Sequence, residues 1–281
     1  MMRLGLAGYP VVFSLSPRLH MAALKAAGLD GEYLLYPVPP ADRPGLSALL
    51  ERVRVGELRG LNVTVPHKQN VLPLLDELTP AAQRIGAVNT ILMKDGKLNG
   101  NNTDAAGFLA DFDEFSRSLS EAPRRALVLG AGGAARAVVY ALRGAGLEVI
   151  VAARDAAQAA ALTRALGRDA DGDQPVPIAL NRAEMEPVLD RPVMIVNATS
   201  AGMAPKTDWS PWPEGLAFPH GSAVYDLVYD PRETRLMRQA SAAGVCARGG
   251  LGMLVEQAAL AFEIWTGRPA SRAAMYSAVE E

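Results

Sequence analysis

Residues 126–136 have the sequence Ala126-Leu127-Val128-Leu129-Gly130-Ala131-Gly132-Gly133-Ala134-Ala135-Arg136. The apolar run is typical of a buried strand, and it leads directly into a glycine-rich turn and an alanine-rich helical segment ending near Leu142. The turn has the pattern G-x-G-x-x-A in the strand-to-helix context that a dinucleotide site requires. Gly130 would permit the tight turn, and Gly132 would let the backbone approach a pyrophosphate. The alternative is a turn that needs glycine for its backbone conformation alone.

Strands and helices continue to alternate after this turn. We expect a strand over 148–153, a helix over 156–166, and further strands over 193–197 and 223–229. This alternation predicts an α/β fold with a Rossmann-type doubly wound parallel sheet. The second strand ends at Ala153-Arg154-Asp155, where dinucleotide sites meet the adenosine ribose. Arg154 favours the 2′-phosphate of NADP, whereas the charge of Asp155 would repel it.

The first 30 residues predict a strand followed by a helix. The apolar strand over 4–7 ends at turn residues, and Ser16-Pro17 opens a helix with Ser16 as its cap. Ser14 and Ser16 then lie where an open α/β sheet places its ligands, and their hydroxyls would suit a carboxylate. Capping by Ser16 alone is the alternative.

Residues 60–68 predict a strand end that runs into a helix. Thr64 would cap this helix, Pro66 would occupy its first turn, and Lys68 would lie in the same turn. A cation at a helix N-terminus lies at the unfavourable end of the dipole, which would make Lys68 a better proton donor. The alternative is an ordinary surface lysine on a capped helix.

Residues 85–104 predict a hairpin and a polar turn. The hairpin would turn at Asp95-Gly96, and the run 99–104 has no apolar residue to bury, so Asp104 would cap a helix starting near 105. Asn89, Asn102 and Asp104 lie at strand ends. If they face Lys68, amides and a carboxylate would line a cleft suited to redox chemistry on a polyhydroxylated small molecule.

Composition excludes several classes of protein. The 281 residues suffice for two domains, and the formal net charge of −2 gives no electrostatic case for nucleic acid or an anionic membrane as partner. The single cysteine excludes an internal disulfide framework and suits the cytoplasm. No apolar run approaches the roughly 20 residues that span a bilayer. The three histidines have no metal-ligand spacing, so no metal site is expected.

Several motifs in order resemble the shikimate dehydrogenase family over nearly the whole chain. They are Ser14-Leu15-Ser16-Pro17, residues 62–68, residues 86–90, Asn101-Asn102-Thr103-Asp104, residues 130–134, residues 197–203, residues 225–229 and residues 250–257. The resemblance implies a substrate-binding catalytic domain over 1–106, an NADP-binding Rossmann domain over 107–249, and C-terminal helices over 250–281 that return to the first domain.

The resemblance also implies roles for individual residues. Ser14 and Ser16 would hold the substrate carboxylate, and Lys68 would be the catalytic acid/base beside Asp104. The groups around the ring hydroxyls would be Asn62, Thr64, Asn89, Asp104, Tyr229 and Gln257. The cofactor would be bound by Gly130, Ala131, Gly132, Gly133, Ala134, Ala153, Arg154, Asp155, Gln158, Thr199, Leu227 and Gly250, the last two beside the nicotinamide.

The implied reaction is the reversible reduction of 3-dehydroshikimate to shikimate by NADPH, in a monomer or homodimer. Two stretches of the sequence depart from the family pattern. Phe13 stands where many members have histidine, and Asp155 and Gln158 stand where members place a hydroxyl and a second basic residue. The second departure raises an alternative, a quinate/shikimate dehydrogenase that uses NAD. A non-catalytic sensor of shikimate or dinucleotide is disfavoured because Lys68 and Asp104 are both present.

Overall fold

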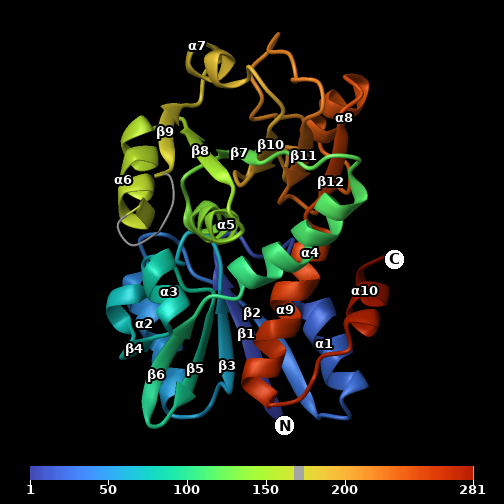
Figure 1. Cartoon of the computed structure of the whole chain (residues 1–281). Coiled ribbons are helices and arrows are strands. Elements are labelled where there is room, and N and C mark those ends of the chain that lie inside the picture. Colours follow the sequence, from blue (N-terminus) through green and yellow to red (C-terminus); the bar gives the residue numbers. More distant parts are fainter. Residues whose placement is uncertain (168–173, 281) are drawn as a thin grey trace. The chain divides into compact units, whose positions relative to one another are not determined.

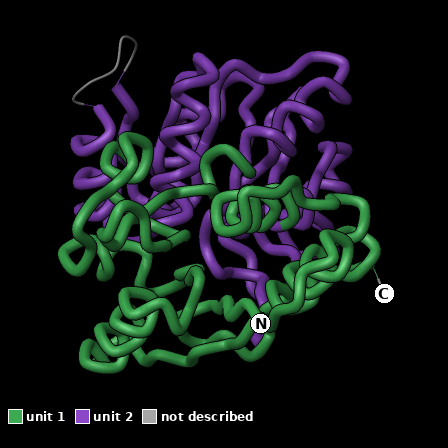
Figure 2. Tube along the Cα trace, turned by 90° about the horizontal axis from the view of Figure 1, so that it is seen from below, with its two compact units in different colours: residues 1–107, 255–281 green, residues 108–254 purple. Residues whose placement is uncertain are grey.

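A computed structural model describes residues 1–167 and 174–280. The chain divides into two compact units, coloured separately in Figure 2: unit 1 contains residues 1–107 and 255–281, and unit 2 contains residues 108–254. Two helices, α4 (Asp104–Ser118) and α9 (Leu251–Thr266), each contain a boundary between the units.

Unit 1 contains a mixed sheet with the strand order β2-β1-β3-β5-β6-β4. The strands are β1 (Met2–Gly8), β2 (Gly31–Pro37), β3 (Gly60–Val63), β4 (Glu77–Leu78), β5 (Thr90–Lys94) and β6 (Lys97–Asn101). Strands β1, β2 and β3 are parallel, while β5 is antiparallel to both β3 and β6. The predicted hairpin at Asp95-Gly96 is therefore confirmed, and both turn residues have positive φ, 50° and 76°.

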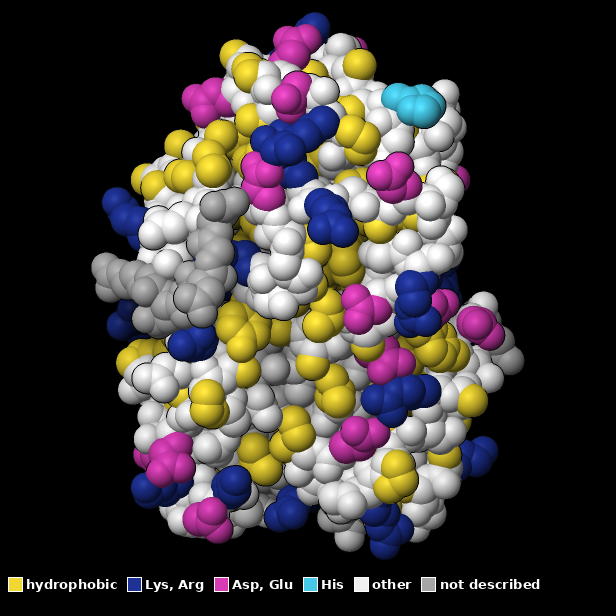
Figure 3. Space-filling view, viewed as in Figure 1, with side chains coloured by type: hydrophobic (Ala, Val, Ile, Leu, Met, Phe, Trp, Pro, Cys, Tyr) yellow, Lys and Arg dark blue, Asp and Glu magenta, His cyan; other side chains and the backbone are white. Residues whose placement is uncertain are grey.

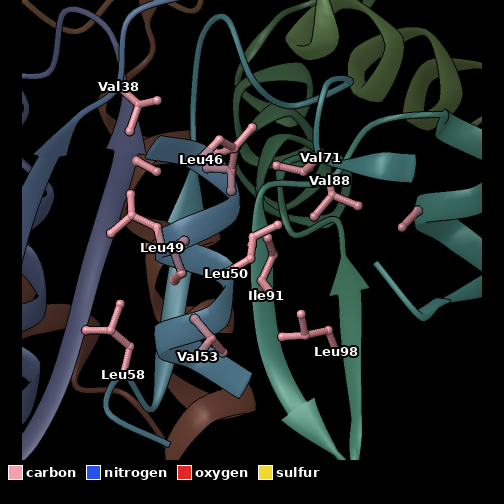
Figure 4. Packing of buried hydrophobic residues seen from close by; sticks show 14 residues of the cluster. Val38, Leu46, Leu49, Leu50, Val53, Leu58, Val71, Val88, Ile91 and Leu98 are labelled. Carbon is pink, nitrogen blue, oxygen red and sulfur yellow. The ribbon is translucent and has the colours of Figure 1, made fainter. Parts of the chain in front are cut away.

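Helix α2 (Arg43–Arg54) covers part of this sheet. Its buried residues Leu46, Leu49, Leu50 and Val53 recur at helical spacing and form one apolar stripe. Figure 4 shows this stripe facing the strands, in one buried cluster that includes Ile91 of β5. The cluster fixes the sheet from which the polar residues described below project.

The C-terminal helices belong largely to unit 1, as predicted. Helix α10 (Arg272–Glu280) packs against α1 (Ser16–Ala26), and the two lie together in Figure 1. Trp265 of α9 is fully buried, and its indole N–H donates to the carbonyl oxygen of Ile91 at 3.1 Å. The end of the chain is thereby tied to the N-terminal sheet.

Unit 2 contains the all-parallel sheet β12-β11-β10-β7-β8-β9. Its strands are β7 (Arg125–Leu129), β8 (Glu148–Ala153), β9 (Val176–Ala179), β10 (Met194–Asn197), β11 (Ala223–Asp226) and β12 (Cys246–Gly249). Helices α5 (Gly133–Gly144), α6 (Ala156–Gly167) and α8 (Arg235–Ala242) and the short α7 (Arg182–Met185) connect them. The predicted Rossmann-type sheet is confirmed.

Helices cover both faces of this sheet. Val224 packs with Leu236 of α8 in one cluster. The next residue along β11, Tyr225, points to the opposite face, where its ring lies 5.1 Å from that of Phe108 of α4. The hydroxyl of Tyr225 donates to the buried carboxylate of Asp111, which also anchors α4 to the unit.

The helix predicted to start at Pro66 does not form. Residues 65–71 are turns, followed by the 3-10 helix η1 (Leu72–Leu74) and strand β4, and α3 (Pro80–Ile85) comes later. The carbonyl oxygen of Lys68 accepts from Val88 N at 2.8 Å, so it is not used within a helix. Pro73 would in any case interrupt a helix running through 78. The helix-dipole argument for Lys68 therefore does not apply.

Candidate active site

The topology of unit 1 brings the predicted polar residues to one edge of its sheet. The carboxyl ends of β1 and β3 lie at the same edge because these strands are parallel. Strand β5 begins at that edge and β6 ends there, because each is antiparallel to its predecessor. Ser14 and Ser16 follow β1, Thr64 and Lys68 follow β3, Asn89 precedes β5, and Asn102 and Asp104 follow β6.

Lys68 and Asp104 form an ion pair at this edge. Lys68 Nζ lies 2.7 Å from Asp104 Oδ2, and the two side chains are only 13% and 5% exposed. Water screens a pair with so little exposure less than it screens a surface pair. Asp104 does not cap α4 as predicted. The Asn102 side chain does so, with its Oδ1 accepting from Ala105 N at 3.2 Å, and the Asp104 carboxylate is directed to Lys68.

The side-chain amide of Asn89 holds the other oxygen of this carboxylate. Asn89 Nδ2 donates to Asp104 Oδ1 at 2.9 Å, and it also lies 3.3 Å from Gln257 Oε1. The orientation of the amide is fixed because Asn89 Oδ1 accepts from the backbone N–H of Thr103 at 2.8 Å. Both carboxylate oxygens of Asp104 are thus engaged. Gln257 of α9 thus lies beside this cluster.

A second amide, that of Asn62, lies on the adjacent strand β3. Its Oδ1 accepts from the Tyr33 hydroxyl at 2.8 Å, and its Nδ2 donates to Asn89 O at 3.0 Å. Thr90 Oγ1 lies 3.2 Å from the same nitrogen. Asn62 is therefore held by groups from β2 and β5, and it is 5% exposed.

Ser14 and Ser16 lie close to each other at the start of α1. The Ser14 hydroxyl donates to Ser16 Oγ at 3.1 Å and accepts from Ser16 N at 3.2 Å. The predicted cap at Ser16 is wrong, because the helix begins at Ser16 itself and its cap position, Leu15, makes no side-chain hydrogen bond within the described chain. Two hydroxyls beside a helix N-terminus still suit an anionic group.

The glycine-rich turn of unit 2 joins β7 to α5. Gly130 has φ +110°, and a Cβ there would lie 3.0 Å from Thr199 Cγ2. A Cβ at Gly132 would meet no heavy atom within 4 Å. Gly132 is the cap position of α5, and no side chain of the described residues caps this helix. The first backbone N–H groups of α5 thus lie at a terminus with an open approach, which fits a pyrophosphate. Ala131 belongs to the same turn, and Gly133 and Ala134 are the first residues of α5.

The end of β8 carries the residues expected to meet the ribose. Asp155 Oδ1 accepts from Ala157 N at 2.9 Å, and its Oδ2 accepts from Gln158 Nε2 at 3.0 Å. Asp155 therefore caps α6, and the positive end of the helix dipole offsets part of its charge. Arg154 is exposed, and Ala153 is the buried last residue of the strand.

Leu227 and Gly250 follow neighbouring strands of the same sheet. A Cβ at Gly250 would lie 2.2 Å from the carbonyl oxygen of Leu227, so only glycine fits there. Gly250 N donates to Val228 O at 3.1 Å, which fastens the two loops together. Tyr229 is half-buried in the same unit.

Comparison with known proteins identifies the family. Residues 6–91 match the shikimate dehydrogenase substrate binding domain, and residues 250–280 match the shikimate 5′-dehydrogenase C-terminal domain. The shikimate dehydrogenase (NADP(+)) of Salinibacter ruber is 44% identical over 280 residues, which cover 98% of this chain and 95% of that protein. The chain belongs to the shikimate dehydrogenase family. The resemblance inferred from the sequence motifs is thereby confirmed.

Solved structures of shikimate dehydrogenase relatives share the fold. The shikimate 5-dehydrogenase of Thermus thermophilus, solved with NADP(H) and shikimate, has a TM-score of 0.84 and 42% identity, covering 100% of this chain and 99% of that one. Quinate dehydrogenase from Corynebacterium glutamicum, solved with NAD, has a TM-score of 0.85 and 32% identity, covering 99% and 98%.

Sequence reasoning assigned no role to three residues that orient the side-chain amides of Asn62 and Asn89. Tyr33, Thr90 and Thr103 hydrogen-bond Asn62 or Asn89 and fix the orientation of their amides. Tyr33 stands outside every family motif, so a motif search had no signal for it. Thr64 lies beside Gly8, where a Cβ would be 2.3 Å from Thr64 Cγ2. Unit 2 contains Tyr229, Leu227 and Gly250.

Other kinds of site have little support in the described residues. No group of three His, Cys, Asp or Glu side chains is placed to hold a metal ion within the described ranges. None of the described helices has the length and apolar character needed to cross a membrane. On the face shown in Figure 3, basic and acidic side chains are intermixed.

Proposed function

We propose that this chain is an NADP-dependent shikimate dehydrogenase, which reversibly reduces 3-dehydroshikimate to shikimate. The observation that carries the proposal is the Lys68–Asp104 pair, which is largely buried and held by Asn89 at the polar edge of unit 1. An ammonium group positioned in this way beside a carboxylate suits general acid/base catalysis at a hydroxyl or ketone. The family assignment supports shikimate as the ring compound bound there.

Groups with complementary chemistry would bind the substrate at this edge. The Ser14 and Ser16 hydroxyls would hold its carboxylate beside the N-terminus of α1. The ring hydroxyls would meet the amides and carboxylate described above, together with Thr64. Amides of fixed orientation suit this role, because a donor that cannot rotate recognises a hydroxyl with less loss of entropy.

Lys68 would provide and recover the proton. In the direction of reduction, its ammonium stabilises the oxygen that becomes negative and then donates a proton to it. Asp104 holds Nζ at 2.7 Å while Asn89 keeps that carboxylate from rotating. The remaining 13% exposure of the lysine side chain provides contact with solvent for reprotonation.

The glycine-rich turn of unit 2 would hold the cofactor, which when bound supplies or accepts the hydride. The α5 N-terminus would bind its pyrophosphate through backbone N–H groups, with Gly132 permitting close approach. Arg154 would meet the 2′-phosphate. The preference for NADP is supported by the capping role of Asp155, because a carboxylate engaged with a helix N-terminus repels that phosphate less than an unpaired one.

Initial rates with four pairs of reactants test this proposal. Shikimate and quinate are each oxidised with NADP and with NAD, and the reduced nicotinamide is followed by absorbance. A strong preference for shikimate with NADP is expected. Comparable rates with quinate and NAD would instead place the chain with quinate dehydrogenases such as the Corynebacterium glutamicum protein. No turnover with any pair would contradict the proposal.

A further inference from the structure

One buried carboxylate, that of Asp226, connects three segments at the carboxyl edge of the unit 2 sheet. Asp226 ends β11 and is fully buried. Its Oδ1 accepts from Asn197 Nδ2 at 2.8 Å and from Val228 N at 3.0 Å. Its Oδ2 accepts from Thr234 Oγ1 at 2.7 Å. Burying a charge is costly unless hydrogen bonds satisfy it, and here three donors do so.

The side-chain amide of Asn197 connects Asp226 to the loop after β10. Asn197 stands opposite Asp226 in the paired strands and is also fully buried. Because its Nδ2 donates to Asp226, its Oδ1 must face the loop, where it accepts from Thr199 N at 3.0 Å and from Thr199 Oγ1 at 2.7 Å. Thr199 Oγ1 in turn accepts from Ala201 N at 3.1 Å. The side chain of Thr199 is therefore held from two directions.

Thr199 contacts the glycine-rich turn. Its Cγ2 would lie 3.0 Å from a Cβ at Gly130, so the two loops are in close approach. These loops follow β10 and β7, which are neighbours at the middle of the sheet, where the order of the strands reverses. Ligands of open parallel sheets bind at this crevice.

The carboxylate of Asp226 also holds the loop after β11. Its bond to Val228 N fixes the peptide that follows Leu227, and Val228 O accepts from Gly250 N at 3.1 Å. Asp226 thus joins the loops after β10 and β11 directly, and the backbone bond from Gly250 N attaches the loop after β12 to the second of them. Burial raises the pKa of Asp226 to about 6, against the hydrogen bonds from Thr234, Val228 and Asn197, which lower it.

We infer that Asp226 is a positioning residue for the dinucleotide, which sets Thr199 against the glycine-rich turn through Asn197 and sets the Leu227 loop through Val228 N. The inference rests on the proposed use of a dinucleotide by this chain. Asp226 itself is buried behind these loops and acts only through them.

Direct binding of NADPH, measured by its fluorescence, tests the inference together with steady-state kinetics. Asp226→Ala should raise the Kd and the KM for NADPH at least tenfold, while the Kd for shikimate changes less than twofold. Asp226→Asn keeps an Oδ1 acceptor for Asn197 and Val228, so its Kd should return to within about threefold of the wild type. A merely structural role would lower stability without this split between the two ligands.

Thr234→Val is the matched control. It removes the hydrogen bond to Asp226 Oδ2 and leaves the two hydrogen bonds to Asp226 Oδ1, from Asn197 and Val228, in place. Stability should therefore fall while the Kd for NADPH stays within twofold. An equal loss of affinity in Thr234→Val and Asp226→Ala would overturn the inference.

Thr199→Val keeps the side-chain shape and removes the hydroxyl that donates to Asn197 Oδ1. It should raise the Kd for NADPH severalfold, and an unchanged Kd would overturn the inference even if Asp226→Ala fails to fold. Wild-type protein that binds NADPH but does not oxidise shikimate would contradict the proposed function alone.

Discussion

His20 should make unit 1 less stable in acid, because burial of its imidazole disfavours a second proton in the folded state. The ring is fully buried in α1, stacked on Tyr33 at 4.3 Å between centroids and 5.3 Å from Trp265. Neither ring nitrogen has a hydrogen-bond partner among the described residues. Burial lowers the pKa of His20 to about 3, and the nearby Asn62 opposes this shift only in part.

The sign and size of the effect follow from linkage. A depressed folded-state pKa contributes stability that is present above the unfolded pKa of 6.5 and is lost as the pH falls toward 3. At pH 5.0 the unfolded histidine is almost fully protonated while folded His20 is neutral. The resulting loss is about 2 kcal/mol relative to pH 7.5. Asp226 acts in the opposite direction, because its pKa is raised to about 6 and acidification relieves the cost of its buried charge.

Because of this opposition, the assay compares variants rather than the wild type alone. Urea unfolding at pH 7.5 and 5.0 gives the change in unfolding free energy for wild type and for His20→Phe, which keeps a ring on Tyr33. Any repacking cost of the phenyl ring is present at both pH values and cancels. The variant should lose about 2 kcal/mol less than the wild type on acidification. Hydrogen exchange of α1 and α10 would locate the effect in unit 1.

His220→Gln is the control, since His220 is exposed in unit 2. This variant should show the wild-type loss. Equal losses in wild type and His20→Phe would refute the reasoning, and so would an NMR titration of folded His20 near pH 6.5.

Three further outcomes follow from the geometry. Lys68→Ala should retain binding of both ligands but lose kcat by about 10²–10⁴-fold in steady-state assays, and near-normal kcat would remove Lys68 from the chemistry. Asp155→Ser should keep the cap of α6 while removing its charge, so titration should show tighter NADP binding by about fivefold and little change for NAD. Gly250→Ala should destabilise unit 2 by about 1–3 kcal/mol in urea unfolding because its Cβ would meet Leu227 O at 2.2 Å, whereas Gly144→Ala, with no atom within 4 Å, should not.

The Rossmann unit could be predicted from sequence because its signal is local. The strand, the glycine-rich turn and the helix over 126–142 are contiguous, and each residue there follows the rule for its own element. The helix predicted over residues 64–78 does not form, and the reason is the opposite one, a distant partner. Thr64 and Pro66 form a local helix-start pattern, but a bond from Val88 N, twenty positions further along, takes the Lys68 carbonyl. Local pattern reasoning has no access to such a partner.

The same distinction explains what could be predicted of the site. Lys68, Asn89 and Asp104 could be named because each stands in a short polar motif at a strand end. Their mutual geometry could not, because it depends on which way each amide is turned. The Asn89 amide is oriented by Thr103 and contacts Gln257, which lies 168 positions away in the sequence. Its orientation is therefore a property of the assembled unit.

Because no helix forms at Lys68, other contacts must position its ammonium group. A lysine in a turn receives no orientation from a helix, so its position depends on the group that it contacts. That group, Asp104, is the first residue of the 15-residue helix α4, whose start is fixed by the Asn102 cap, and the second oxygen of its carboxylate is held by Asn89. The rigid partner is thus the carboxylate, and the ammonium aligns on it. A substitution at Asn89 or Asn102 should therefore displace Lys68 by way of Asp104.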